Sequence, residues 1–190
     1  MHRWMLAVMA GAAFTFTAMP AQAAWKTYID KELGFSVMMP GDVTASLGTF
    51  RGQLAGPRQT INYRSMDDNI EYRITVMNFV QAQAEGAALL GERQFMFQDK
   101  KKVLTDVFSR VGSGADAVYG RKSVIDLPDN KGRSTGAFYF TKGKLFLFET
   151  TVPANGNLAS PDPDRFIDSV SFNLSRPDQG AVELKTPELE

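Results

Sequence analysis

The residue types that most often carry out catalysis are nearly absent from this chain. Its only histidine is His2, and it has no cysteine. Downstream of His2, the sequence therefore excludes Ser-His-Asp and Cys-His catalysis, imidazole proton transfer, and the usual zinc, copper and haem ligands. Oxygen-ligated cations such as calcium are the metals that remain open. We expect a protein that is not an enzyme and that has no catalytic residues, no metal site and no cofactor.

The best candidate for a binding site is the segment Tyr119-Gly120-Arg121-Lys122, in which Tyr119, Arg121 and Lys122 would contact a ligand or partner. An arginine beside an aromatic residue can hold a carboxylate or phosphate through two parallel hydrogen bonds. The alternative, which we favour, is a strand whose arginine points outward and whose glycine allows close packing. Similarly, the aromatic residues of 138–140 and 146–148 can line an apolar pocket or fill a packed core.

Two further motifs have simpler structural interpretations. Gly112-Ser113-Gly114 lacks the G-x-S-x-G spacing of a nucleophilic serine, and no histidine follows to activate it. Asp162, Asp164 and Asp168 offer carboxylates to calcium, but they lack the glycine and final glutamate of an EF-hand loop. We expect a loop at the first motif and helix capping at the second.

Carboxylate chemistry remains as a third alternative. Glu71, Glu149 and Asp126 are acids that would have to pair at a defined distance to hydrolyse a glycoside. A sequence with 21 acidic residues contains such pairs by chance, so a hydrolase is the weakest of the functional hypotheses.

The N-terminus has the pattern of a secretory signal peptide. A short positive start, Met1-His2-Arg3, precedes an apolar stretch of about 16 residues, and Pro20 then breaks the helix. Ala21 and Ala23 are the small residues that a signal peptidase reads, which predicts cleavage before Ala24. The alternative is an uncleaved anchor, but the stretch falls short of the roughly 20 residues that cross a bilayer. We expect a periplasmic or secreted bacterial protein without a membrane span in its mature chain.

The mature chain is long enough for one domain and nearly neutral. Cleavage leaves 190 − 23 = 167 residues, with 21 acidic and 21 − 1 = 20 basic side chains. Nucleic-acid binding requires a basic excess or stripe, and this composition provides none. The partner is therefore expected to be an envelope protein or a small ligand.

Hydrophobic periodicity predicts strands joined by short turns, with two helices. In Ile70–Val80, four apolar residues alternate for one buried face, whereas Met77 and Phe79 indicate a bulge or burial on both faces. Residues 42–57 read as a loop or a poor edge strand. The expected strands are 24–29, 34–39, 59–65, 70–80, 103–111, 117–127, 137–140 and 145–148.

The main helix is expected over residues 82–100, with Leu90, Phe97, Ala87, Leu89 and Met96 on one half of its surface. A short second helix is expected to begin at Ser160–Asp164, where prolines are tolerated in the first turn. We predict a single domain over residues 24–174 and a disordered polar tail over residues 175–190.

In their order, four of these segments resemble a family of small exported bacterial proteins with the fold of the photosystem II extrinsic protein (PsbP-like). The resembling segments are Leu33–Gly41, Tyr119–Arg121, the aromatic hairpin 138–146 and Arg165–Phe172. The resemblance implies an α+β domain, an α/β/α sandwich with a central, mainly antiparallel sheet, one long helix and one short C-terminal helix. It also implies a non-enzymatic accessory or assembly protein. The resemblance supplies no catalytic residue. Because the N-terminus is shorter than in the plant photosynthetic members of the family, the resemblance does not imply a role in a photosystem.

The residues and the resemblance together favour an exported, non-enzymatic accessory or binding protein of the cell envelope that acts through a protein partner. A periplasmic carrier of a small apolar or anionic ligand is the first alternative, and a carboxylate-based hydrolase is the second.

Overall fold

A computed structural model of the 190-residue chain describes residues 23–54, 56–79, 85–175 and 180–187. The predicted signal peptide, including Ala21, lies outside the described residues except for its last residue, Ala23. Ala24, the expected first residue of the mature chain, accepts a hydrogen bond from the backbone N–H of Gly41 at 3.2 Å.

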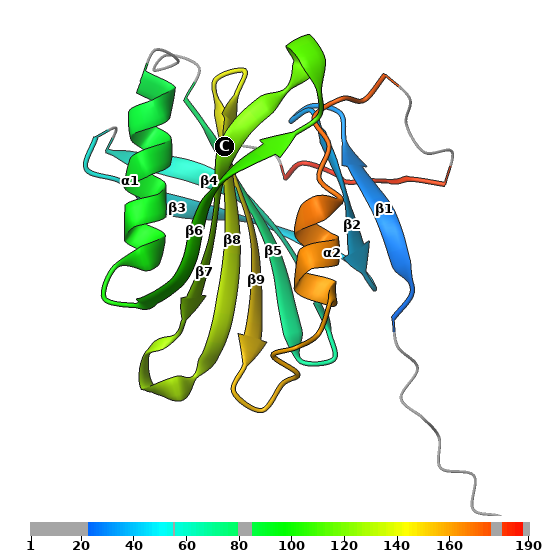
Figure 1. The fold of residues 1–190 in the computed structure, drawn as a ribbon. Helices are drawn as coiled ribbons and strands as arrows, with labels where there is room; N and C mark the ends of the chain where they lie inside the picture. The colour runs from blue at the N-terminus through cyan, green and yellow to red at the C-terminus, as the bar shows by residue number, and fades with distance from the viewer. Residues whose placement is uncertain (1–22, 55, 80–84, 176–179, 188–190) are drawn as a thin grey trace, which may run out of the picture.

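The central sheet has seven strands in the order β3-β4-β5-β9-β8-β7-β6, and every neighbouring pair is antiparallel (Figure 1). Tight turns connect β4 to β5 and β8 to β9, and both central residues of each turn have positive φ, as two-residue hairpin loops require. The strands are β3 (Thr44–Arg51), β4 (Pro57–Asp67), β5 (Ile70–Asn78), β6 (Lys102–Val111), β7 (Val118–Asp126), β8 (Gly132–Thr141) and β9 (Lys144–Pro153).

A small sheet and two helices complete the described fold. The small sheet has the order β10-β1-β2, with β1 at Trp25–Asp30, β2 at Phe35–Pro40 and β10 at Val182–Glu183. The helices are α1 (Gly86–Gln98) and α2 (Asp162–Asp168), and short 3₁₀ turns occur at η2 (Gly114–Asp116) and η3 (Pro128–Asn130). In Figure 1, α2 lies beside β2 and β1, whereas α1 lies apart from them.

The central strands β8 and β9 are covered on both faces, which explains their unbroken apolar runs. Because successive side chains of a strand point to opposite faces, Phe138 and Leu147 pack with Phe97 of α1, whereas Tyr139 and Phe148 pack with α2 and the small sheet. The predicted α/β/α sandwich is therefore confirmed, with the addition that β1 and β2 share one outer layer with α2.

The side chains on both faces of β5 are buried, in agreement with the sequence pattern. Ile70, Tyr72, Ile74 and Val76 are buried in the core beneath α2, and Met77 is buried on the α1 side. Burial on both faces, one of the two predicted explanations, is the correct one. The segment 42–57 contains β3, an edge strand of the sheet, as its weak pattern allowed.

The main helix is confirmed, but its buried stripe is narrower than predicted. Leu89 and Phe97 are buried and Leu90 is partly buried, whereas Ala87 and Met96 are exposed. The helix packs chiefly on β8 and less on β7 and β9. Because it lies over a narrow part of the sheet, only a narrow row of its side chains is buried. No helix in the described part of the chain has the length and apolar character needed to cross a membrane.

The predicted disordered tail is wrong for its described C-terminal part. Val182–Glu183 form β10, which pairs in parallel with β1, and the backbone N–H of Leu184 donates to Ile29 O at 2.8 Å. Val182 and Glu183 join the sheet through their backbone and stay exposed, and Leu184 beside them packs against the core. Backbone pairing of this kind leaves no hydrophobic periodicity to read.

Candidate functional site

The structure separates the three residues that the sequence grouped as a binding site. All lie on β7, where alternation places Tyr119 and Arg121 on the α1 side and Lys122 on the α2 side. The Lys122 ammonium is 2.8 Å from Asp164 Oδ1 and 3.7 Å from Asp168 Oδ1, both on α2. Lys122 therefore joins a helix to the sheet, and Tyr119 and Arg121 remain as neighbours on the other face.

The guanidinium of Arg121 already holds a carboxylate of the same chain. Its Nη2 and Nε atoms donate to Asp106 Oδ1 on β6 at 2.6 and 3.2 Å, and its Cζ lies 4.5 Å from the ring centroid of Phe108. Burial raises the pKa of Asp106, but hydrogen bonds from Arg121, Gln98 and Gln94 outweigh that effect and lower it overall. A ligand carboxylate at Arg121 would thus compete with Asp106.

A groove of about 540 Å³ separates α1 from β6 and β7. On the α1 side the groove is lined by the small residues Gly86, Ala87 and Gly91, which leave space above the helix. The opposite side is lined by Phe108, Tyr119 and Arg121. At the start of α1 the packing is close, because a Cβ on Gly86 would lie 2.3 Å from the Phe140 ring. The groove therefore exists because a glycine-rich helix lies beside two aromatic side chains.

Those two aromatic side chains belong to a larger exposed apolar surface. Val103, Leu104, Val107 and Phe108 of β6 are exposed together with Tyr119 of β7, Phe108 to 85% and Tyr119 to 69%. Phe108 and Tyr119 lie on the α1 side, whereas Val107, opposite Lys122 in the ladder, lies on the α2 side, so these residues surround the sheet edge. We call these five residues the β6–β7 surface. Sequence reasoning missed it because a strand with apolar residues on both parities is normally covered on both faces, as β8 and β9 are. The detectable signal was the sequence of this segment itself, which places Val103, Leu104, Val107 and Phe108 within six positions.

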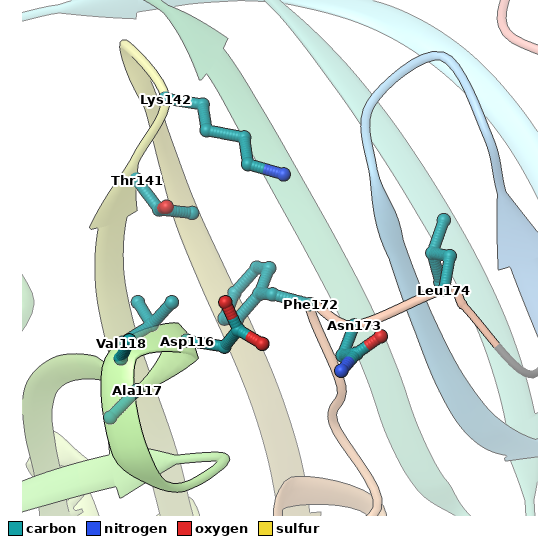
Figure 2. Close-up of a pocket in the computed structure, with 9 residues that line it drawn as sticks. Asp116, Ala117, Val118, Thr141, Lys142, Phe172, Asn173 and Leu174 are labelled. Atoms are coloured by element: carbon teal, nitrogen blue, oxygen red, sulfur yellow. The ribbon is translucent and has the colours of Figure 1, made fainter.

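A second hollow, of about 340 Å³, lies between η2, the β8–β9 turn and residues 172–174. Figure 2 shows Asp116, Lys142 and Asn173 around this hollow, with Phe172 between them. Three loops that are far apart in the sequence form this hollow, so no local sequence motif could have predicted it. Its charged groups have opposite signs, which suits a small polar molecule better than an apolar or a purely anionic one.

The other candidate residues have structural partners. Ser113 lies in the turn that precedes η2. The carboxylate of Glu71 is 2.5 Å from Arg73 Nη2 and 2.8 Å from Arg64 Nε, and that of Asp126 is 3.0 Å from Arg133 Nη2. Within the described ranges no three acidic side chains gather in a way that could hold a metal ion. These acids therefore neutralise arginines on the sheet.

Glu149 differs from the other two acids because a hydroxyl holds it. Its Oε1 accepts a hydrogen bond from Ser134 Oγ at 3.1 Å, across the β8–β9 pair. Arg73, which bonds Glu71, also stands opposite Glu149 across the β5–β9 pair. Glu71 and Glu149 thus share the charge of one arginine, whereas Asp126 pairs with Arg133.

No protein-family model and no curated protein sequence matches the chain. Among solved structures, the solution structure of cyanobacterial PsbP (CyanoP) from Synechocystis sp. PCC 6803 is similar to it over 84% of this chain and 96% of that chain. The TM-score is 0.49 and the sequence identity 11%. The match is to a protein of the kind that the sequence motifs resemble.

Proposed function

We propose that this chain is an exported accessory or binding protein of the bacterial cell envelope, which acts by binding a protein partner and not by catalysis. The observation that carries the proposal is the β6–β7 surface, on which Phe108 and Tyr119 are the most exposed members. Contiguous exposed apolar patches mark interaction sites, and aromatic residues and arginine are enriched in the cores of protein interfaces. Here the guanidinium of Arg121 lies over the ring of Phe108.

The position in the envelope rests on the signal-peptide pattern of residues 1–23. An exported protein that exposes this much apolar surface needs a partner to cover it, because water-exposed apolar area favours association. The chemistry of the site agrees: aromatic rings and an arginine already bound to Asp106 recognise a surface, and they provide neither a nucleophile nor a general base.

The second candidate function is a carrier of a small molecule. The groove between α1 and β7 favours it, because its volume of about 540 Å³ lies in the range of ligand pockets. An apolar ligand would lie on Leu90, Phe140 and Tyr119, and an anionic group would have to displace Asp106 from Arg121.

Native mass spectrometry of the tagged full chain, purified gently from the envelope fraction of its own host, tests both functions. We expect loss of residues 1–23 and a second protein mass that travels with the wild-type chain. Tyr119→Asp should remove that mass, since a carboxylate in an apolar contact costs desolvation energy. Leu54→Asp is the matched control, an exposed apolar residue between β3 and β4 that should leave the complex intact.

Other outcomes have defined meanings. A small added mass in place of a protein would support the carrier. A bare mature chain, or a partner that survives Tyr119→Asp, would contradict the proposed partner surface, and retention of residues 1–23 would contradict processing and release into the envelope.

A further inference from the structure

Strand β6 forms one of the two edges of the central sheet. It is the last strand in the sheet order, it has ten residues, and within the described ranges no strand pairs with its outer side. Natural edges are usually short or carry proline, bulges or charges that prevent pairing with another chain. β6 lacks proline, and its only lysine, Lys102, and its bulge at Leu104 lie at its start. Thr105–Val111 is regular, and its charges are Asp106 and Arg110. Such an edge offers backbone donors and acceptors to a further strand.

The opposite edge of the same sheet makes a useful comparison. β3 carries small or polar residues, Ala45, Ser46 and Gly48, along its centre, and its largest exposed apolar side chain is Leu47 at 37%. β6 exposes four large apolar side chains over ten residues. Of the two edges, β6 is therefore the one suited to a stable pairing.

We propose that the partner of this edge is a second copy of the chain, with the two β6 strands antiparallel and Phe108 on the two-fold axis. The inference rests on the proposed function, since it assigns the β6 part of the same surface to a particular partner. It leaves Tyr119 and the α1 groove of each copy beside the new interface, where a further partner can bind.

Charge complementarity selects this register. In a symmetric antiparallel pair, opposite residues have numbers that sum to twice that of the axial residue, and the charges of β6 lie at Lys102, Asp106 and Arg110. With Phe108 on the axis, Asp106 faces Arg110 of the second copy twice. With Asp106 on the axis, two carboxylates face each other and Lys102 faces Arg110, both destabilising.

The remaining register with opposite charges face to face places Leu104 on the axis and pairs Lys102 with Asp106. The ladder between β6 and β7 shifts between Val103 and Thr105, where Leu104 forms a bulge. A bulge breaks the regular alternation of backbone groups, so this register cannot form a continuous ladder. The register on Phe108 uses only Thr105–Val111, which is regular.

Individual side chains fit the same register. The backbone of Arg110 pairs with Tyr119 of β7, but its side chain makes no ion pair or hydrogen bond within the described ranges. Arg121 and Gln94 both donate to Asp106 Oδ1, so the Arg110 guanidinium would approach Oδ2 of Asp106 in the second copy. Phe108 is 85% exposed in the single chain and lies under Arg121. On the axis two such rings would lie about 4.5–5.5 Å apart at their Cβ atoms, and each would bury apolar area that is otherwise in water.

The absence of cysteine from the chain allows a direct test. Opposite residues of an antiparallel pair have Cα atoms about 4.5–5.5 Å apart, within the range that a disulfide spans. We expect Phe108→Cys, in the otherwise full chain, to form a covalent dimer under mild oxidation. Thr105→Cys is the control on the same strand: its thiols would lie about 20 Å apart along the strands and should not cross-link. Equal cross-linking of both variants would overturn the register.

Charge reversal tests the pairing without oxidation. Sedimentation equilibrium should show a concentration-dependent dimer for the wild-type chain. Arg110→Asp should weaken it at least about tenfold, since two pairs of carboxylates then face each other. Arg51→Asp, a reversal on exposed β3, is the control and should change nothing. Mixing Arg110→Asp with Asp106→Arg should restore a heterodimer, because every facing pair is again of opposite charge. This rescue cannot arise from misfolded variants.

The two proposals fail in different ways. A wild-type chain that remains monomeric at all concentrations, or a dimer indifferent to Arg110→Asp, overturns the inference and leaves the Tyr119-dependent envelope partner untouched. A dimer that behaves as described, with no Tyr119-dependent partner in the envelope, supports the inference and removes the proposed function.

Discussion

Gly120 shows how one residue sets the spacing between two strands. A Cβ at this position would lie 2.0 Å from Phe138 O and 2.5 Å from the ring of Tyr139. The backbone oxygen cannot move without disturbing the β7–β8 ladder, so Gly120→Ala should destabilise the protein by about 1–3 kcal/mol. The measurement is the free energy of unfolding in urea. A loss of stability in this range would agree with the interpretation that Gly120 is present to allow close packing of the strands.

Gly91 supplies the matched control with the opposite sign. It lies in the exposed middle of α1, and a Cβ there would have no heavy atom within 4 Å. Gly91→Ala should therefore stabilise the chain by about 0.5–1 kcal/mol, since glycine loses more backbone entropy than alanine in a helix. If both glycines responded alike to alanine, the close approach at Gly120 would not be what determines its effect.

At the scale of elements, β10 fixes the edge of the small sheet. Besides its pairing with β1, this segment places Thr186 Oγ1 3.1 Å from Asp30 Oδ2, the oxygen that also accepts from Tyr63 Oη at 2.6 Å. A chain that ends at residue 180 would expose the β1 edge and one side of the buried Asp30 carboxylate. We expect a loss of about 1–3 kcal/mol in unfolding free energy, measured in urea.

The control for that truncation is a chain that ends at Pro187, which keeps every contact described for β10. Its stability should equal that of the full chain. Equal stability of the two truncated chains would mean that β10 and its contacts with β1 and Asp30 contribute nothing to the free energy of unfolding.

The sequence predicted elements that carry a local signal, which is a side-chain period, an unbroken apolar run or a start motif with proline. β5 alternates and α1 has a turn-spaced stripe, so both were predictable, as was the hairpin with glycine at Gly143. β10 was not, because parallel pairing through the backbone requires no pattern. The narrow burial of α1 was not either, since the number of strands that a helix contacts is a property of the assembled sheet.

At the scale of the whole molecule, sites were hard to predict because closeness in the sequence differs from closeness in the fold. Adjacent residues such as Arg121 and Lys122 look like one cluster in a sequence, yet on a strand they face opposite layers. Conversely, Asp106 and Arg121 are 15 positions apart and form one ion pair. The β6–β7 surface and the hollow of Figure 2 depend on which elements end up uncovered or adjacent, which only the assembled fold determines.

Alkaline pH tests the packing of the whole molecule through its tyrosines. Burial raises the pKa of Tyr63, Tyr72, Tyr139 and Tyr28, and at Tyr63 the hydrogen bond to Asp30 adds to the effect. Their contribution to stability is fully present below the unfolded-state pKa of about 10. It is lost as the pH rises from there toward the folded-state values, because only the unfolded chain then releases the phenolic protons.

We therefore expect the free energy of unfolding to fall above about pH 10, by about 1.4 kcal/mol per pH unit for each tyrosine that stays protonated only in the folded chain. Urea unfolding at a series of pH values gives the slope, and the ultraviolet absorbance of tyrosinate shows when each ring ionises. Tyr63→Phe should reduce the slope by the contribution of one tyrosine, because it removes one of the phenols whose pKa the fold raises. Ionisation of all tyrosines near pH 10 with the fold intact would contradict the buried aromatic core, because a phenolate cannot remain in that core without a compensating charge.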